Sequence, residues 1–330
     1  MNRRHFFLFF FPAFFCLLFF SCTKKTADTK GIILGFSQIG AESAWRNCNT
    51  RSVQEAAADA GVQLLFFNAE QKQENQIKAI RSFIAYQVDV IAFVPIVSDG
   101  WENVLEEARV AQIPVLICDR EINIYDETLY AGYIGTNMYE QGRRSAEYLI
   151  KKFTNPDTGK ISADRSKPVK IVELQGTEGS SPAIMRAKGF RDVLAEYPEF
   201  KIIYSESGDF LRSKGYELMR TIPEELWGFD VIYSHNDSMT LGAIDALKEK
   251  NIVPGKDVVV ISIDAEQAAI NAMQRGEINC VVECNPKQGP DIMRLVSRLV
   301  QNEPIPRVMY MIEEVFTEWD NLSAVAPRGY

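Results

Sequence analysis

The sequence predicts an α/β protein of two similar units, each built on a parallel sheet that helices cover on both faces. Short, nearly continuous apolar runs alternate with segments of helical spacing, which is typical of buried parallel strands. This alternation occurs twice along the chain, in two stretches of similar length. About 300 residues follow the N-terminal segment, which is more than one hydrophobic core usually holds. These observations favour two lobes over one large sheet.

Residues 1–22 are predicted to be a signal or lipoprotein segment rather than part of the fold. Two arginines precede a run of almost entirely apolar residues over 6–20, and Ser21-Cys22 then leads into a polar stretch. The run is too short for a stable membrane anchor, and its flanks are those of a secretory signal. The small residue before Cys22 resembles a bacterial lipobox, so we expect lipidation at Cys22. A signal that is simply cleaved is the alternative.

The first stretch of the pattern contains four predicted strands and a clear helix. Apolar residues recur at helical spacing after Ser98-Asp99, which predicts an amphipathic helix there. Trp101 lies on the apolar face of this helix, and we expect it in the core. Buried strands are predicted at 32–36, 64–67, 88–94 and 115–118.

The second stretch repeats the pattern after a polar segment over 152–167. Met239, Ala243 and Leu247 recur at helical spacing, and Pro254-Gly255 follows the end of that helix. Strands are predicted at 169–174, 202–205, 231–233 and 258–263, and helices around 184–197, 213–222 and 239–250.

Composition excludes several classes of function. Without its first segment the chain has a formal net charge of −10 instead of −8, and no basic stripe, which argues against nucleic-acid binding. The four cysteines beyond that segment show no CxxC spacing, so a disulfide framework is not predicted. His235 is the single histidine beyond residue 22, which gives little support for a metal site. We therefore expect no cofactor.

Polar and aromatic side chains follow strand after strand at the point where each predicted strand ends. Asp119-Arg120, Asn236 and Asp264 lie at such positions, and ligands of open α/β sheets bind beyond the carboxyl ends of the strands. Asp and Asn accept hydrogen bonds from hydroxyl groups, and Arg presents a planar fork of donors. Trp45 and Phe210 offer aromatic faces for the C–H face of a sugar ring. This set suits a neutral ligand with many hydroxyl groups.

Each of these features also has a simpler interpretation. Asp119-Arg120 is equally consistent with an ordinary ion pair at a strand end. His235 is expected to be a loop or supporting residue rather than a catalyst. The loop over 176–179 has neither of the glycine patterns that bind nucleotides, so it gives little support for a nucleotide ligand.

With these residues, the chain resembles the type-I periplasmic sugar-binding proteins, the family of the ribose and galactose receptors. Within that family it looks most like the galactofuranose-binding branch that serves bacterial ABC importers. The likeness runs from about residue 31 to the C-terminus. It is carried by GFSQIGAESAWR (35–46), QKQENQIKAIRSF (71–83), DR (119–120), VELQGTEGSSPAIMRAKGF (172–190), SGDFLRSKG (207–215), HNDSMTLGAI (235–244) and SIDA (262–265).

The resemblance implies two Rossmann-like lobes with parallel sheets, joined by three crossover segments that act as a hinge. It implies an N-terminal lobe of 31–135 plus 286–306 and a C-terminal lobe of 136–285 plus 307–330. It places a sugar in the cleft between the lobes, with Glu283 as a weaker candidate contact. The ligand-binding residues that it implicates are Glu42, Trp45, Arg46, Asp119, Arg120, Asn137, Arg186, Phe210, Asn236 and Asp264.

The leading hypothesis is therefore a non-enzymatic, monomeric receptor outside the cytoplasm. It would capture a monosaccharide such as galactofuranose and deliver it to the membrane permease of an ABC importer, held at the membrane by its lipid anchor. A sugar-sensing lobe that feeds a chemoreceptor or histidine kinase is the first alternative. A glycosidase that uses Glu42, Asp119 or Asp264 is the second. A repressor of the same lobe fold is disfavoured, because a signal segment stands where a DNA-binding motif belongs.

Overall fold

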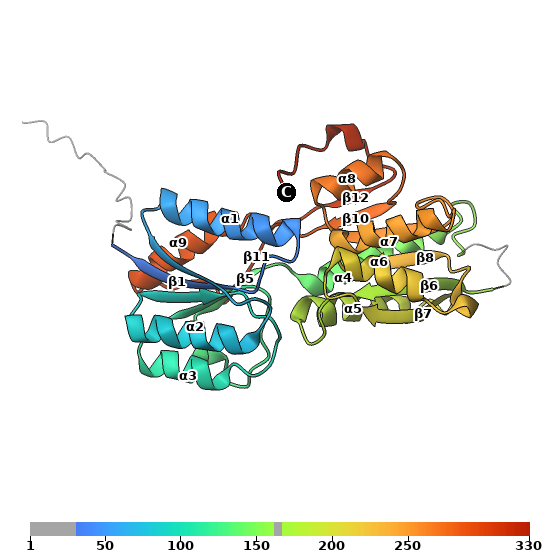
Figure 1. Ribbon diagram of the computed structural model, residues 1–330. Coiled ribbons are helices and arrows are strands. Elements are labelled where there is room, and N and C mark those ends of the chain that lie inside the picture. Colours follow the sequence, from blue (N-terminus) through green and yellow to red (C-terminus); the bar gives the residue numbers. More distant parts are fainter. Residues whose placement is uncertain (1–30, 162–166) are drawn as a thin grey trace, which may run out of the picture.

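The computed structural model describes residues 31–161 and 167–330, which form two lobes, each with a six-stranded sheet (Figure 1). The predicted signal segment and the predicted lipidation at Cys22 lie outside the described residues. Within the described ranges, no helix is long and apolar enough to span a membrane. The α/β class with two mostly parallel sheets is as predicted.

The sheet of the first lobe is entirely parallel, with strand order β11-β5-β4-β3-β1-β2. Helices α1 and α9 pack on one face and α2 and α3 on the other (Figure 1). The strands are β1 Ile33–Gln38, β2 Gln63–Asn68, β3 Val90–Phe93, β4 Val115–Asp119, β5 Gly132–Gly135 and β11 Val308–Tyr310. The helices are α1 Ala44–Asp59, α2 Gln73–Tyr86, α3 Glu102–Val110 and α9 Gly289–Val300.

The sheet of the second lobe has the order β12-β10-β9-β8-β6-β7, and only the edge strand β12 runs antiparallel. Helices α4 and α5 cover one face, while α6, α7 and α8 cover the other. The strands are β6 Val169–Gln175, β7 Phe200–Ser207, β8 Val231–Ser234, β9 Val259–Asp264, β10 Cys280–Glu283 and β12 Val315–Thr317. The helices are α4 Met138–Phe153, α5 Ser181–Leu194, α6 Arg212–Thr221, α7 Asp237–Glu249 and α8 Gln267–Gln274.

The central strands read as continuous apolar runs because both of their faces are buried. In β3, Val90 and Ala92 pack under α1 and α9, whereas Ile91 and Phe93 pack against α2 and α3. Successive side chains of a strand point to opposite faces, so a strand between two helical layers must be apolar at every position. Trp101, fully buried beside Phe93, belongs to this second cluster as predicted.

The chain passes between the two sheets three times. It crosses between Gly135 and Met138, between Glu283 and Gly289, and between Tyr310 and Val315. The last crossing differs from the expectation that residues from 307 onward belong to the second lobe. Strand β11 pairs with β5 in the first sheet instead, so this lobe extends to residue 310. Its three residues are half-exposed at the sheet edge. They begin the apolar run over 308–312, which was not among the predicted strands.

The four cysteines within the described ranges are free and buried. Cys118 and Cys280 lie in strands β4 and β10 and contribute to the cores of the two lobes. These thiols act as small apolar side chains.

Helices α4 and α5 approach each other so closely that glycine is required at their contact. A Cβ added to Gly189 would lie 2.1 Å from the backbone oxygen of Tyr139, and one added to Gly142 would lie 2.1 Å from that of Arg186. Such overlaps with backbone atoms are relieved only when the helices move apart, which loosens the core beneath them.

Replacing Gly189 with alanine is expected to destabilise the protein by about 1–3 kcal/mol, because the added methyl group separates α4 from α5. Urea unfolding followed by circular dichroism measures the change. Ser82→Ala on the exposed face of α2 serves as the control and should leave the midpoint near that of the wild type. An unchanged midpoint for Gly189→Ala would contradict the close helix contact.

Candidate functional site

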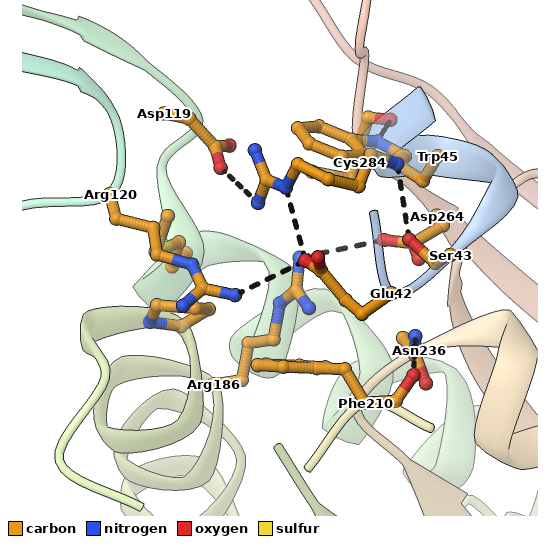
Figure 2. Close-up of a pocket in the computed structure, with 13 residues that line it drawn as sticks. Glu42, Ser43, Trp45, Asp119, Arg120, Arg186, Phe210, Asn236, Asp264 and Cys284 are labelled. Atoms are coloured by element: carbon orange, nitrogen blue, oxygen red, sulfur yellow. Dashed lines mark hydrogen bonds and ion pairs between the residues drawn. The ribbon is translucent and has the colours of Figure 1, made fainter. Parts of the chain in front are cut away.

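A pocket of about 330 Å³ lies between the two lobes, at the carboxyl ends of their strands (Figure 2). Nine of the ten ligand-binding residues predicted from the sequence line it. The lining residues are Glu42, Ser43, Trp45, Arg46, Asp119, Arg120, Met138, Pro182, Arg186, Phe210, Asn236, Asp264 and Cys284.

The first lobe contributes a buried network of opposite charges. The Arg46 guanidinium lies 3.1 Å from Glu42 Oε1 and 2.7 Å from Asp119 Oδ2. Ser43 fixes the start of α1, because its side chain accepts a hydrogen bond from the Arg46 backbone N–H. Burial alone lowers the pKa of Arg46, but the carboxylates of Asp119 and Glu42 outweigh that effect and raise it above its ordinary value. Arg46 is therefore a permanent cation that holds two carboxylates in place.

Arg120 is only partly satisfied by its neighbours. Its Nη1 donates to the Ile96 carbonyl at 3.1 Å, and its Nη2 lies 3.9 Å from Glu42 Oε1. The Nε–H has no hydrogen-bond partner among the described residues, although the residue is only 3% exposed. Burial and the nearby Arg46 lower the pKa of Arg120 to about 10, so it still carries its charge at neutral pH. A buried donor without an acceptor is costly, and an oxygen-rich ligand would satisfy it.

Phe210 supplies an aromatic face from the second lobe. The guanidinium carbon of Arg120 lies 5.2 Å from the centre of its ring, and that of Arg186 lies 6.0 Å away. The ring occupies the space above Gly176, where an added Cβ would lie 1.8 Å from a ring carbon. Asn236 caps α7 with its side-chain oxygen and donates from Nδ2 to the Phe210 carbonyl at 3.1 Å. Gly176 leaves room for the Phe210 ring, and the Asn236 amide holds the Phe210 backbone in place.

Arg186 and Asp264 form the charged wall of the second lobe. Arg186 Nη2 lies 3.8 Å from Asp264 Oδ1, and Nε donates to Gln141 Oε1 at 2.8 Å. Burial raises the pKa of Asp264 well above its ordinary value, while the Arg186 guanidinium opposes the rise. Figure 2 shows Arg186 and Arg120 pointing into the same space as the Glu42 carboxylate.

The formal charges of the lining residues cancel. Three guanidinium groups, from Arg46, Arg120 and Arg186, share the pocket with three carboxyl groups. A strongly charged ligand would disturb this balance, whereas hydroxyl groups can both donate to carboxylates and accept from arginines. No group of side chains that could hold a metal ion is found in the described parts of the chain.

The two lobes touch directly around this pocket. The Trp45 indole N–H donates to the Cys284 carbonyl at 2.6 Å, and the Trp45 backbone N–H donates to Glu266 Oε1 at 3.0 Å. On the other side, the Ser98 N–H donates to the Gly179 carbonyl at 2.9 Å. These contacts hold the lobes closed over the polar groups.

Two of the predicted contact residues are not among the lining residues, and four lining residues were not predicted. Asn137 is not among the lining residues; its side chain caps α4 by accepting from the Glu140 N–H. Glu283 is also outside the lining and pairs with Arg328. His235 is a supporting residue, as expected: it is buried against Glu173, and its carbonyl accepts from Arg186. The lining residues not predicted are Ser43, Met138, Pro182 and Cys284.

Partial signals for the missed residues exist in the sequence. Ser43 lies within the loop that follows the first strand, and Cys284 directly follows an apolar run that forms β10. Met138 and Pro182 each stand near the start of a helix that faces the other lobe. Their apolar side chains gave no reason to separate them from core residues.

Comparison with known proteins gives a consistent result. The galactofuranose-binding protein YtfQ of Escherichia coli (strain K12) is 43% identical over 263 residues, which are 78% of this chain and 79% of that protein. A structure from Mycobacterium smegmatis in complex with β-D-fucofuranose is 40% identical, with a TM-score of 0.80 over 87% of this chain and 91% of that one.

A second solved structure is that of the periplasmic binding protein component of the arabinose ABC transporter from Shewanella sp. ANA-3, bound to α- and β-L-arabinofuranose. It is 38% identical, with a TM-score of 0.81 over 88% of this chain and 93% of that one. The family described as the periplasmic binding protein domain matches residues 34–304. The resemblance inferred from the sequence is thereby confirmed, and this chain belongs to the periplasmic binding protein domain family.

Proposed function

We propose that this protein is the sugar-binding component of an ABC importer and that it captures a furanose sugar, such as galactofuranose, between its lobes. The observation that carries the proposal is Arg120, a buried lining residue whose Nε–H has no acceptor among the described residues. A ring oxygen or hydroxyl of a sugar supplies that acceptor. The sugars named for the similar proteins, galactofuranose, fucofuranose and arabinofuranose, share a five-membered ring.

The pocket offers complementary groups to both faces of such a ring. Phe210 covers the apolar C–H face, and the burial of this face contributes to affinity. Glu42 and Asp264 accept from hydroxyl groups, while Arg120 and Arg186 donate to sugar oxygens. Because these groups come from both lobes, only the closed arrangement satisfies all of them at once.

Binding is therefore coupled to closure of the hinge. A sugar that contacts both lobes favours the closed state by the difference in its affinity for the two states. The closed form then presents the sugar to the permease. Members of this family are binding proteins rather than enzymes, so the carboxyl groups of the pocket hold the sugar and do not cleave it.

The cellular location extends this proposal. Export by the segment before residue 23, followed by acylation of Cys22, would hold a monomeric receptor beside its permease. The arginines, the apolar run and the Ser-Cys pair of that segment support this assignment. Stable anchoring needs more than one acyl chain, because a single chain binds membranes only marginally.

Titration calorimetry with D-galactose, D-fucose, L-arabinose, D-ribose and D-glucose tests the proposed ligand class. The protein is first unfolded and refolded to remove any sugar that co-purifies with it. We expect micromolar or tighter binding of at least one of the first three sugars. Carbon-13 NMR of the C1-labelled sugar should show the furanose ring in the bound state. A bound pyranose, or no binding in the whole series, would contradict the proposal.

Replacing Arg120 with alanine is expected to weaken sugar binding by roughly 30-fold or more, because a truncated charged donor costs about 2 kcal/mol or more. Calorimetry measures the affinity, and urea unfolding should remain cooperative. Arg109→Ala removes an exposed arginine paired with Glu106 and serves as the control with wild-type affinity. Wild-type affinity in Arg120→Ala would remove Arg120 from the site.

Replacing Cys22 with serine is expected to abolish acylation, because the lipid is attached to the thiol. The variant should move from the membrane fraction to the soluble fraction of the cell and lose the incorporation of radiolabelled palmitate. Cys48→Ser, at a buried position in α1, is the control and should stay with the membranes. A Cys22→Ser variant that remains acylated would refute lipidation at this position.

A further inference from the structure

The three crossover segments meet at one side chain, that of Glu313. Its Oε1 accepts from the Thr136 hydroxyl at 2.8 Å and from the Asn285 backbone N–H at 3.0 Å. Thr136 lies on the first crossover, Asn285 on the second and Glu313 on the third. One carboxyl group thus contacts or belongs to each of the three crossover segments.

The other oxygen of Glu313 connects this junction to the pocket. Oε2 accepts from Gln141 Nε2 at 3.2 Å, and the same amide nitrogen donates to the Glu283 carbonyl at 2.9 Å. Gln141 Oε1 in turn accepts from Arg186 Nε at 2.8 Å. A continuous chain of hydrogen bonds therefore runs from the crossovers through the buried Gln141 to a lining arginine.

The direction of each hydrogen bond in this chain is fixed by chemistry. An arginine only donates, and a backbone carbonyl only accepts. The Gln141 amide must then turn its oxygen to Arg186 and its nitrogen to Glu283 and Glu313. The opposite orientation would place like groups against each other at Arg186 and at the Glu283 carbonyl. Glu313 Oε2, which accepts from the same amide nitrogen, supports this orientation.

We propose that Glu313 is a positioning residue, which orients Arg186 through Gln141 while it joins the three crossovers. The expected effect of Glu313 on sugar affinity depends on the proposed function. The orientation of Arg186 by Glu313 does not depend on it. Burial raises the pKa of Glu313 to about 7, although Asn285, Thr136, Arg186 and Gln141 all oppose the rise.

Glu313→Gln tests the proposal because it keeps the shape but replaces one acceptor oxygen with an N–H donor, which then faces either the Gln141 N–H or the Asn285 N–H. We expect sugar affinity to fall by about tenfold. Gln141→Glu should also weaken binding, because two carboxyl groups then face each other. The double variant Glu313→Gln/Gln141→Glu restores a donor opposite an acceptor and should recover much of the lost affinity. The recovery should be partial, because the carboxyl group introduced at position 141 lies against the Glu283 carbonyl, which also only accepts.

Glu314→Gln, at the exposed neighbouring position, is the matched control and should bind like the wild type. Loss of structure alone would make the double variant at least as weak as either single variant, so the absence of recovery would overturn the proposal. Wild-type affinity in Glu313→Gln would overturn it as well.

A readout without sugar separates this proposal from the proposed function. The Arg186 Nε–H signal in nitrogen-15 NMR, assigned with Arg186→Lys, should exchange with water faster in Glu313→Gln than in the wild type. Failure of the wild type to bind any sugar would count against the proposed function only. An Arg186 signal with equal protection in both proteins would overturn the role of Glu313.

Discussion

The need to pair buried charges organises the space between the lobes. Six ionisable side chains from the two lobes share one pocket there, and each is almost entirely removed from water. A buried charge that loses its partner costs about 3–5 kcal/mol. Arg46 forms ion pairs with Glu42 and Asp119, whereas the Nε–H of Arg120 has no acceptor among the described residues.

The parallel sheets explain why these groups meet. The strands of each sheet end at the same edge, and the two edges face each other across the pocket. Asp119 and Asp264 stand at equivalent places, each as the last residue of its strand, and both have a positive φ, of 61° and 131°. Backbone of this kind is uncommon for residues other than glycine. It turns the chain sharply at the point where each strand delivers its carboxyl group.

The sequence was sufficient for the class of fold and for most of the pocket, for a physical reason. Central strands such as β4 and β9 are buried on both faces, so their apolar runs stand out, and the polar residues after them stand out equally. Asn137 is not among the lining residues, and an asparagine that caps a helix looks the same in sequence as one that binds a ligand. The role of Glu313 was invisible, since its partners at 136, 141 and 285 are distant in the chain. The edge strand β11 begins an apolar run over 308–312, but the last crossover was placed before this run, so the strand was assigned to the wrong lobe.

The threefold crossing also bears on the order in which the chain gains structure during synthesis. The first lobe is not a continuous segment: α9 and β11, which cover and complete its sheet, are made only after strands β6 to β10 of the second lobe. The second lobe, by contrast, lacks only β12 and the C-terminal tail when β10 has been made. Contacts between distant segments form slowly, because a long loop must close before they are gained. The lobe that is synthesised first is therefore the one that waits longer for its missing pieces, with the apolar surface beneath α9 exposed in the meantime.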